Sequence, residues 1–386
     1  MRRNLILFIV AGVIVLALVF FLRPGEEADH LIAEVVPGTP IPIEGFSYAD
    51  GSRTLSFPAD FGPHPDFQTE WWYYTGNLED ESGRHFGYEL TFFRISLVPP
   101  DQSPARSSSW GTTQFYMAHF ALTDVEAGEF HAFQRYQRGA EDLAGAQADP
   151  YHVWLEDWDV QQVAANRYEL AASNEGLRIA LQLTDEKGPI LQGDSGYSRK
   201  GADPNSASYY YSETRLITQG EVQIEERVFR VNGLSWKDHE FSSNALEAGQ
   251  VGWDWFSIQL DDGYEVMLYQ IRRVDGSIDP FSSGTLIAPD GTTQQLSQDD
   301  FLIDIQGTWH SPHSDAVYPM GWSIQFPEAN LELVLEPFLE DQELNLATVY
   351  WEGAVRITGT HNGAGVSGFG YVEMTGYAAP LTLVYK

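Results

Sequence analysis

The residues best suited to chemistry are gathered in two segments, Trp-Lys-Asp-His-Glu-Phe at 236–241 and Gly-Trp-Asp-Trp-Phe at 252–256. The first holds two acids and His239 within one strand length, and in the second Asp254 stands between Trp253 and Trp255. A carboxyl group desolvated by tryptophans has its ionised form disfavoured, so its pKa rises and it can donate a proton near neutral pH. We therefore expect Asp254 to be an acid, with His239 orienting it or a water molecule.

The aromatic residues around these acids suggest what the acid would act on. Tryptophan faces can stabilise a developing cation on an apolar substrate, which suits acid-catalysed addition of water to an alkene. The ligand-lining candidates here are Trp236, Phe241, Trp253 and Trp255. A structural alternative stays open, in which Asp254 accepts backbone or indole N–H groups and His239 is a hydrogen-bonded core residue.

A second cluster is Glu-Trp-Trp-Tyr-Tyr at 70–74. Strand alternation puts Glu70, Trp72 and Tyr74 on one face, where they would line a pocket with a single carboxylate. The alternative is an aromatic ladder in a sheet core. Just upstream, residues 64–66 (His-Pro-Asp) are interpreted as a turn.

Other polar residues receive structural interpretations. His310 and His313 have a metal-like spacing, but Asp315 is their only nearby third ligand and Pro312 disfavours a helix, so we expect no metal site. Glu89 and Glu373 are expected to be buried partners of arginines such as Arg94 or Arg215. The chain has no Gly-x-Ser-x-Gly elbow, Walker loop, Rossmann glycine fingerprint or HExxH, which disfavours the corresponding hydrolases, nucleotide enzymes and zinc proteases.

Short aromatic and β-branched runs separated by Gly, Asp, Asn and Ser predict β-strands throughout the body. The predicted strands are 70–78, 85–97, 115–123, 209–217, 222–231, 253–260, 264–273, 331–335 and 350–358. Asp262-Gly263 and Asp290-Gly291 predict hairpin turns. Two segments, 73–91 and 350–375, share a Tyr/Trp-Gly run followed by Gly-Tyr and Glu, which predicts two related hairpins. Many short strands with regular turns are typical of sandwiches and barrels.

The charge balance and the absence of cysteine disfavour several classes of partner and site. The 386 residues carry a formal net charge of −33, which disfavours nucleic acid and anionic membrane surfaces as partners. With 43% hydrophobic and 13% aromatic residues the chain can nonetheless bury a large core. The absence of cysteine excludes disulfides, thiolate metal sites and cysteine nucleophiles.

The N-terminus predicts a membrane anchor. Arg2 and Arg3 precede an apolar run from Leu5 to Leu22, about 18 residues and long enough to span a bilayer. Bulky residues occupy the positions where a cleavage site would need small ones, which favours an uncleaved signal anchor over a cleaved signal peptide. The arginines would keep the body extracytoplasmic, periplasmic or at the cell surface. Residues 24–45 are interpreted as a linker.

Five segments together resemble a known family. They are residues 69–76 (Thr-Glu-Trp-Trp-Tyr-Tyr-Thr-Gly), 208–216, 233–241, 252–256 and 370–377. This set resembles the AttH/carotenoid 1,2-hydratase family of lipocalin-like proteins, over roughly residues 46–386. The resemblance implies an all-β fold of two packed lipocalin-like antiparallel barrels, divided here as 46–243 and 244–386, preceded by the anchor at 1–23.

The resemblance also implies a function. Characterised relatives hydrate a terminal double bond of acyclic carotenoids without a cofactor, and it places His239 on the family's motif histidine and Asp254 on its proposed acid. Phe241 stands where hydratases often have Trp, and Gly252 stands where an aromatic residue would line the site, which departs from the carotenoid hydratase pattern. AttH itself accompanies an ABC transport system.

Three hypotheses remain open. The first is a cofactor-independent lyase acting on an isoprenoid-like or polyunsaturated lipid. The second is a non-catalytic binder of an apolar ligand, with an ABC transporter permease as its partner. The third, a hydrolase, lacks an activated nucleophile in the sequence.

Overall fold

The computed structural model describes residues 44–103, 108–244 and 246–381. The predicted anchor at 1–23 and nearly all of the predicted linker at 24–45 lie outside these residues. Within the described part of the chain, no helix is long and apolar enough to cross a membrane. The strands β1 to β23 belong to one compact unit.

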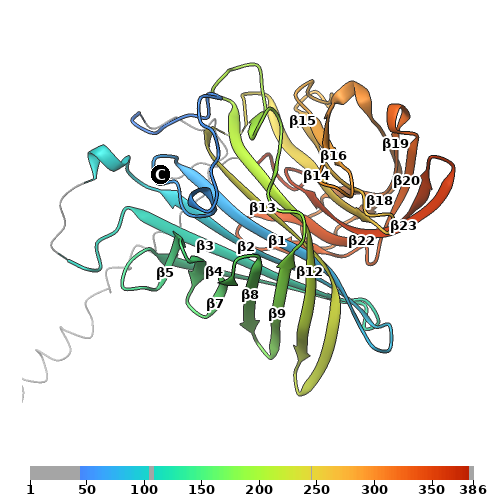
Figure 1. Cartoon of the computed structure of the whole chain (residues 1–386), viewed down its shortest axis with the longest axis horizontal. Helices are drawn as coiled ribbons and strands as arrows, with labels where there is room; N and C mark the ends of the chain where they lie inside the picture. Colours follow the sequence, from blue (N-terminus) through green and yellow to red (C-terminus); the bar gives the residue numbers. More distant parts are fainter. Residues whose placement is uncertain (1–43, 104–107, 245, 382–386) are drawn as a thin grey trace, which may run out of the picture. The chain divides into compact units, whose positions relative to one another are not determined.

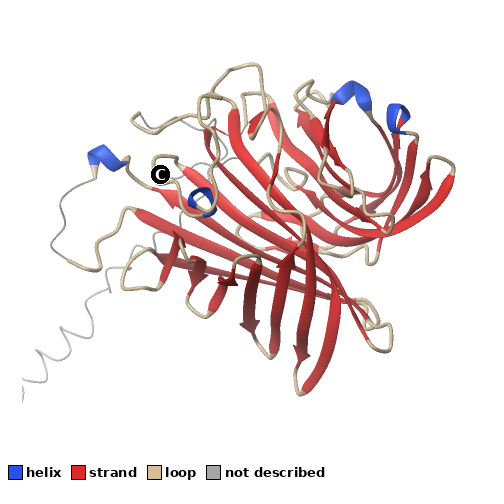
Figure 2. Cartoon of the chain, in the orientation of Figure 1, coloured by secondary structure: helices blue, strands red, loops and turns tan. Residues whose placement is uncertain are grey.

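The fold is all-β, as predicted, and its helices are single short turns (Figure 2). The first sheet has the strand order β4-β3-β2-β1-β13-β12-β9-β8-β7-β6-β5, and β10 and β11 pair with β12. Most of these strands are labelled in Figure 1. Its strands are β1 (Thr69–Asp80), β2 (His85–Ser96), β3 (Gln114–Asp124), β4 (Glu129–Arg138), β5 (Ala144–Ala148), β6 (Tyr151–Leu155), β7 (Trp158–Ala164), β8 (Arg167–Asn174), β9 (Leu177–Asp185), β10 (Ile190–Leu191), β11 (Tyr197–Arg199), β12 (Ala207–Ile224) and β13 (Arg227–Asn244).

The second sheet has the order β17-β16-β15-β14-β23-β22-β20-β19-β18, with β21 paired to β22. Its strands are β14 (Gln250–Leu260), β15 (Glu265–Arg273), β16 (Ser283–Ile287), β17 (Thr293–Ser297), β18 (Leu302–His310), β19 (Val317–Phe326), β20 (Leu331–Pro337), β21 (Glu343–Asn345), β22 (Val349–His361) and β23 (Ala364–Met374). Both sheets are antiparallel and curl toward barrels, consistent with a lipocalin-like fold. The change from one sheet to the other falls between Asn244 and Gln250, and the division into domains at 243/244 stays a prediction.

Local sequence explains most of the turns. Gly263, at φ +87°, and Gly291, at φ +83°, occupy the tight turns predicted between β14 and β15 and between β16 and β17. The predicted strand at 222–231 is wrong as a single element, because Glu225 adopts φ +55° and reverses the chain between β12 and β13.

Both segments of the predicted repeat form hairpins, β1–β2 and β22–β23, and the relation between them stays a prediction. They also contact each other, since Asn77 Nδ2 donates to the Gly370 carbonyl at 3.0 Å. The approach is close at Gly87, where an added Cβ would lie 2.6 Å from the Cβ of Ala354. One apolar cluster fills the inside of each sheet, and a third lies between the sheets.

Candidate functional site

The first group of candidate residues lies on the inner face of the first sheet, where β1 pairs with β13. In this ladder Trp72 is opposite His239 and Glu70 is opposite Phe241. As predicted, Glu70, Trp72 and Tyr74 share one face, and Trp72, Tyr74 and Phe241 belong to the core cluster inside the sheet. The structure therefore brings five of the sequence-predicted site residues together.

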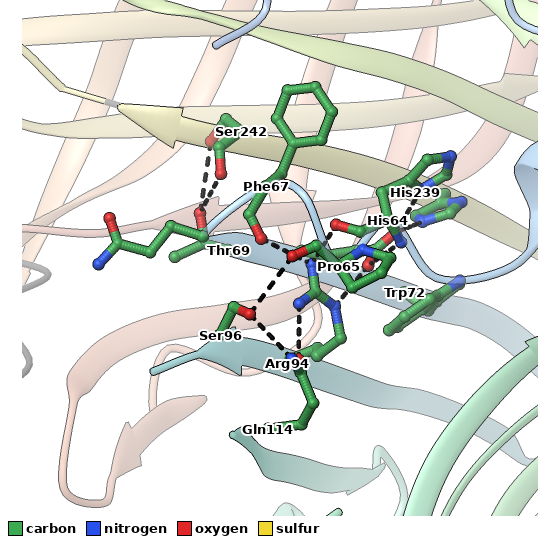
Figure 3. A network of polar contacts seen from close by, with 12 residues as sticks. His64, Pro65, Phe67, Thr69, Trp72, Arg94, Ser96, Gln114, His239 and Ser242 are labelled. Carbon is green, nitrogen blue, oxygen red and sulfur yellow. Dashed lines mark hydrogen bonds and ion pairs between the residues drawn. The ribbon is translucent and has the colours of Figure 1, made fainter. Parts of the chain in front are cut away.

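Glu70 is the centre of a buried hydrogen-bond network on this face. Its partners His64, Arg94 and His239 are labelled in Figure 3. Its Oε1 accepts from Nδ1 of His64 at 2.7 Å and from Nε2 of His239 at 2.8 Å. Its Oε2 accepts from Nε of Arg94 at 2.7 Å. Another guanidinium nitrogen of Arg94 donates to the carbonyls of His64 and Phe67, which holds the loop before β1 against the sheet.

The outer nitrogens of the two imidazoles are also hydrogen-bonded. Nε2 of His64 donates to Oδ1 of Asp60 at 2.9 Å, and Nδ1 of His239 lies 3.0 Å from the Tyr211 hydroxyl. Because both carboxylates only accept, His64 carries hydrogens on both nitrogens, whereas neutral His239 accepts from Tyr211. Residues 64–66 were interpreted as a turn. They do lie in a loop, but the His64 ring is buried within the network.

The pKa values of this network reflect burial opposed by ion pairing. Burial acts to raise the pKa of Glu70, but the charges of Arg94 and His64 and the hydrogen bond from His239 hold it well below its usual range. Burial acts to lower the pKa of His64, yet Glu70 and Asp60 raise it overall. Burial lowers the pKa of His239 to about 4 despite Glu70. The network thus holds an ionised Glu70 beside a neutral His239.

A second buried ion pair lies on the same face. Lys237 Nζ donates to Oε2 of Glu213 at 2.5 Å, and neither side chain is exposed to solvent. Cation–π attraction adds to this pairing. The surrounding ring centroids, 4.6–5.9 Å from Nζ, are those of Phe61, Tyr74, Tyr151, Tyr168 and Tyr211. Lys237 was not among the predicted site residues, although alternation with His239 along one strand places it on this face.

The opposite face of β13 is turned toward the second sheet. The Trp236 and Trp255 rings lie 6.2 Å apart there, and the Tyr73 ring lies 5.1 Å from Trp255. We call this region the inter-sheet layer, defined by Tyr73, Glu89, Trp236, Asp238, Trp253, Trp255, Glu352, Tyr371 and Glu373. Three of the predicted ligand residues, Trp236, Trp253 and Trp255, therefore lie apart from the group around Glu70.

Asp238 is a buried acid of the inter-sheet layer. It accepts from the Tyr210 hydroxyl at 2.6 Å, the Ser212 hydroxyl at 2.5 Å and the Trp236 indole nitrogen at 2.7 Å. Burial raises the pKa of Asp238 to about 7 in spite of these three donors. This carboxyl group can therefore carry a proton near neutral pH.

Three glutamates of the layer form no ion pair with a cation among the residues that the structure describes. Their donors are the Thr91 hydroxyl for Glu89, the Tyr73 hydroxyl at 2.5 Å for Glu352 and the Trp253 indole at 3.1 Å for Glu373. Burial raises the pKa of Glu89 to about 8 and of Glu373 to about 7, and holds that of Glu352 well above its usual range. Glu373 is partly exposed, whereas one oxygen of each of the other two is buried without a hydrogen-bond partner.

The prediction that Glu89 and Glu373 pair with Arg94 or Arg215 is wrong. Arg94 lies on the inner face with Glu70, and strand alternation turns Glu89 the other way. Arg215 pairs with a different glutamate, on β15. The inter-sheet acids are thus left without the positive charge that was expected beside them.

Asp254 lies on the inner face of the second sheet, and its two flanking tryptophans point to the opposite side. It accepts from Nε of Arg272 at 3.1 Å and from the Tyr377 hydroxyl at 3.0 Å. Burial raises the pKa of Asp254, in the direction predicted, although Arg272 opposes the shift. The structure does not bring Asp254 and His239 together, because they lie inside different sheets.

Asp60 and Glu213 were not among the predicted site residues, and Arg94 was predicted beside the wrong acids. A detectable signal existed for Arg94, because it lies directly opposite Glu70 across the β1–β2 hairpin. Counting outward from a turn at 81–84 would have paired the two residues. Glu213 lies directly opposite Lys237 in the β12–β13 pair, but a register shift between Glu213 and Leu216 means that counting from the turn does not pair them. Asp60 lies in a short 3-10 turn before β1, and no strand register places it on this face.

Comparison with known proteins gives this fold a family. The AttH-like family model matches residues 48–377, which cover nearly all of the described body. The chain belongs to the AttH-like family. A solved AttH-like relative is a putative AttH from Nitrosomonas europaea, with 36% identity and a TM-score of 0.76, covering 86% of this chain and all of that one. The predicted family resemblance is therefore confirmed.

Relatives with named activities are more distant. The kievitone hydratase of Nectria haematococca shares the fold at 13% identity and a TM-score of 0.65, over 89% of this chain and 99% of that one. Dehydratase asqC of Emericella nidulans is 22% identical over 48% of this chain. That match spans about half the length (54%) of the curated relative.

Proposed function

We propose that this AttH-like protein is a hydratase or dehydratase that needs no cofactor and acts on an apolar substrate in the inter-sheet layer. The observation that carries the proposal is the set of acids in this layer that form no ion pair among the described residues, with the pKa of Asp238 and Glu373 raised to about 7. Such groups hold a proton at neutral pH and can give it up during a reaction. The names of the hydratase and dehydratase relatives support the same reaction class.

Glu373 is the acid that we propose for the proton transfer, because it is partly exposed and borders aromatic surface. Its proton would add to one carbon of a double bond, leaving a cation on the neighbouring carbon that Trp253 and Trp255 stabilise. Water then bonds to the cation and returns one proton to the Glu373 carboxylate. The reverse sequence eliminates water, so one site serves hydration and dehydration.

Asp254 and His239 remain the alternative acid and orienting residue. Asp254 also has a raised pKa, but Arg272 and Tyr377 already bind its two oxygens. A substrate would have to compete with these partners, whereas Glu373 has a single indole donor among the described residues. If Glu373 is the acid, the substrate binds in the inter-sheet layer; if Asp254 is the acid, the substrate binds on the inner face of the second sheet.

Glu373→Gln tests the proposal, with Asp254→Asn as the matched variant. The full chain is incubated with a panel of isoprenoid and polyunsaturated lipids, and mass spectrometry follows the gain or loss of one water. We expect Glu373→Gln to lower turnover at least 100-fold while ligand binding survives, in keeping with the loss of a general acid. Loss of turnover only in Asp254→Asn would identify Asp254, on the inner face of the second sheet, as the acid instead of Glu373.

The same proposal includes an extracytoplasmic, membrane-anchored body, supported by the apolar run from Leu5 to Leu22 after two arginines. It also includes an apolar ligand, supported by the aromatic residues of the inter-sheet layer. A lipid that co-purifies with the chain and stays unchanged after long incubation would favour a non-catalytic lipid-binding protein over an enzyme. Its partner would then be a transport system.

A further inference from the structure

We propose that His64, Glu70 and His239 form a binding site for a divalent transition metal ion, for which zinc is the probe. One ligand atom from each residue converges at this point, and the three atoms lie within 4.8 Å of one another. The site lies on the inner face of the first sheet. It goes beyond the proposed function, which uses acids of the inter-sheet layer and no metal.

The ligand set is of a kind that such metals use. Nδ1 of His64 and Nε2 of His239 face the same oxygen of Glu70, at 2.7 and 2.8 Å. Two imidazole nitrogens and one carboxylate oxygen are a known zinc ligand set that leaves the fourth position for a small ligand such as water. The three residues come from a loop, β1 and β13, so a bound ion would join three segments that are distant in the sequence.

The outer atoms of all three residues are already held in place. Nε2 of His64 donates to the Asp60 carboxylate, the pattern by which ligating histidines are usually oriented. Nδ1 of His239 faces the Tyr211 hydroxyl, and the second oxygen of Glu70 is held by Arg94. Each ligand therefore has an outer atom held by a separate partner and an inner atom that, among these contacts, meets only the other two ligands.

The competing explanation is a purely structural hydrogen-bond network. Without an ion, hydrogens on Nδ1 of His64 and Nε2 of His239 bridge to Glu70. A metal would replace the first hydrogen, and the second would move to Nδ1 of His239, which would then donate to the Tyr211 hydroxyl. An ion of charge +2 in place of one proton adds a unit of positive charge near Arg94, which an anionic fourth ligand would balance. The two explanations differ in stoichiometric metal binding, which only the first requires.

The chain carries a matched control for adventitious binding. His310 and His313 lie on the surface, with His310 4.0 Å from Asp315 and His313 3.0 Å from Asp341. Exposed histidines beside carboxylates bind zinc weakly without an oriented ligand set. The double variant H310A/H313A should therefore leave tight binding unchanged.

The experiment is calorimetric titration of the chelator-treated full chain with zinc. We expect one equivalent with sub-micromolar affinity in the wild type and in H310A/H313A, and at least a 100-fold loss in Glu70→Gln. Asp60→Asn and Tyr211→Phe, which remove only outer partners, should each weaken binding by about 10- to 100-fold. Near-UV circular dichroism checks that each variant is folded.

Cobalt(II) absorption of the wild-type chain gives a second measurement that requires no substitution at the site. Visible bands of a four-coordinate ion, displaced by one equivalent of zinc, support the proposal. Absence of stoichiometric binding, or binding that disappears in H310A/H313A and persists in Glu70→Gln, overturns it.

Discussion

Two regions of this protein bury the same kind of side chain and leave it in opposite charge states. Glu70, on the inner face of the first sheet, is paired with Arg94 and has a pKa well below its usual range. Glu89 and Glu352, in the inter-sheet layer, are as deeply buried but have no cationic partner among the described residues, and their pKa values are raised. Burial alone therefore does not set the charge of a carboxyl group here; the neighbouring cation does.

The difference bears on function. A paired carboxylate orients its neighbours, as Glu70 orients two imidazoles and a guanidinium. An unpaired, protonated carboxyl group stores a proton that can be transferred, as proposed for Glu373. The first region thus has the paired charges of a binding or positioning site, and the second holds the protonated acids that the proposed catalysis requires.

Arg94→Met should lower the free energy of unfolding more than any other substitution proposed. The substitution leaves the Glu70 charge buried without its guanidinium, and removing one partner of a buried ion pair typically costs about 3–5 kcal/mol. Denaturant unfolding at pH 7 measures the loss. Glu352→Gln is the matched control from the inter-sheet layer, because an amide replacing a protonated carboxyl group should change the free energy of unfolding by less than about 1 kcal/mol. Equal losses in both variants would contradict the assigned charge states.

Glu89→Gln should change how stability depends on pH. The folded pKa of Glu89, about 8, lies above its unfolded value near 4.5, so the folded state binds the extra proton between these two values. Stability contributed below pH 4.5 is then lost as the pH rises toward 8, by about 1.4 kcal/mol per pH unit at most. Unfolding free energies measured from pH 5 to 8 should fall less steeply in Glu89→Gln than in the wild type. An unchanged slope would mean that Glu89 is already ionised at pH 5.

The smallest expected effect compares two tyrosine hydroxyls. Tyr73 donates to Glu352 at 2.5 Å in the inter-sheet layer, and Tyr74 shares a 2.6 Å hydrogen bond with Tyr151 inside the first sheet. If Glu352 is protonated, Tyr73→Phe and Tyr74→Phe should each cost about 0.5–1.5 kcal/mol at pH 7. A cost of about 1.5–3 kcal/mol for Tyr73→Phe alone would instead report an ionised Glu352.

The sequence predicted the strands and the local faces better than the site. Alternation correctly grouped Glu70 with Trp72, and the hairpin signals at Gly263 and Gly291 were correct. Both are short-range properties that a few neighbouring residues determine. The chain reversal at Glu225 was missed because a non-glycine residue in the left-handed region gives no clear turn signal.

The candidate site depended on long-range geometry. Neighbouring motifs placed Asp254 and His239 together, but β13 and β14 belong to different sheets, so their inner faces enclose different cores. The buried role of His64 depends on a loop folding back over β1, where Arg94 holds its carbonyl. Neither relation follows from spacing, because strand pairing and curvature decide which side chains meet.

The alternation along β13 has a consequence for comparing homologues and variant libraries. Between Trp236 and Phe241, odd-numbered positions face the interior of the first sheet and even-numbered positions face the second. Substitution tolerance along this stretch should therefore be scored separately for the odd-numbered and the even-numbered positions. Because the two faces contact different clusters, adjacent positions of this six-residue motif need not covary in an alignment.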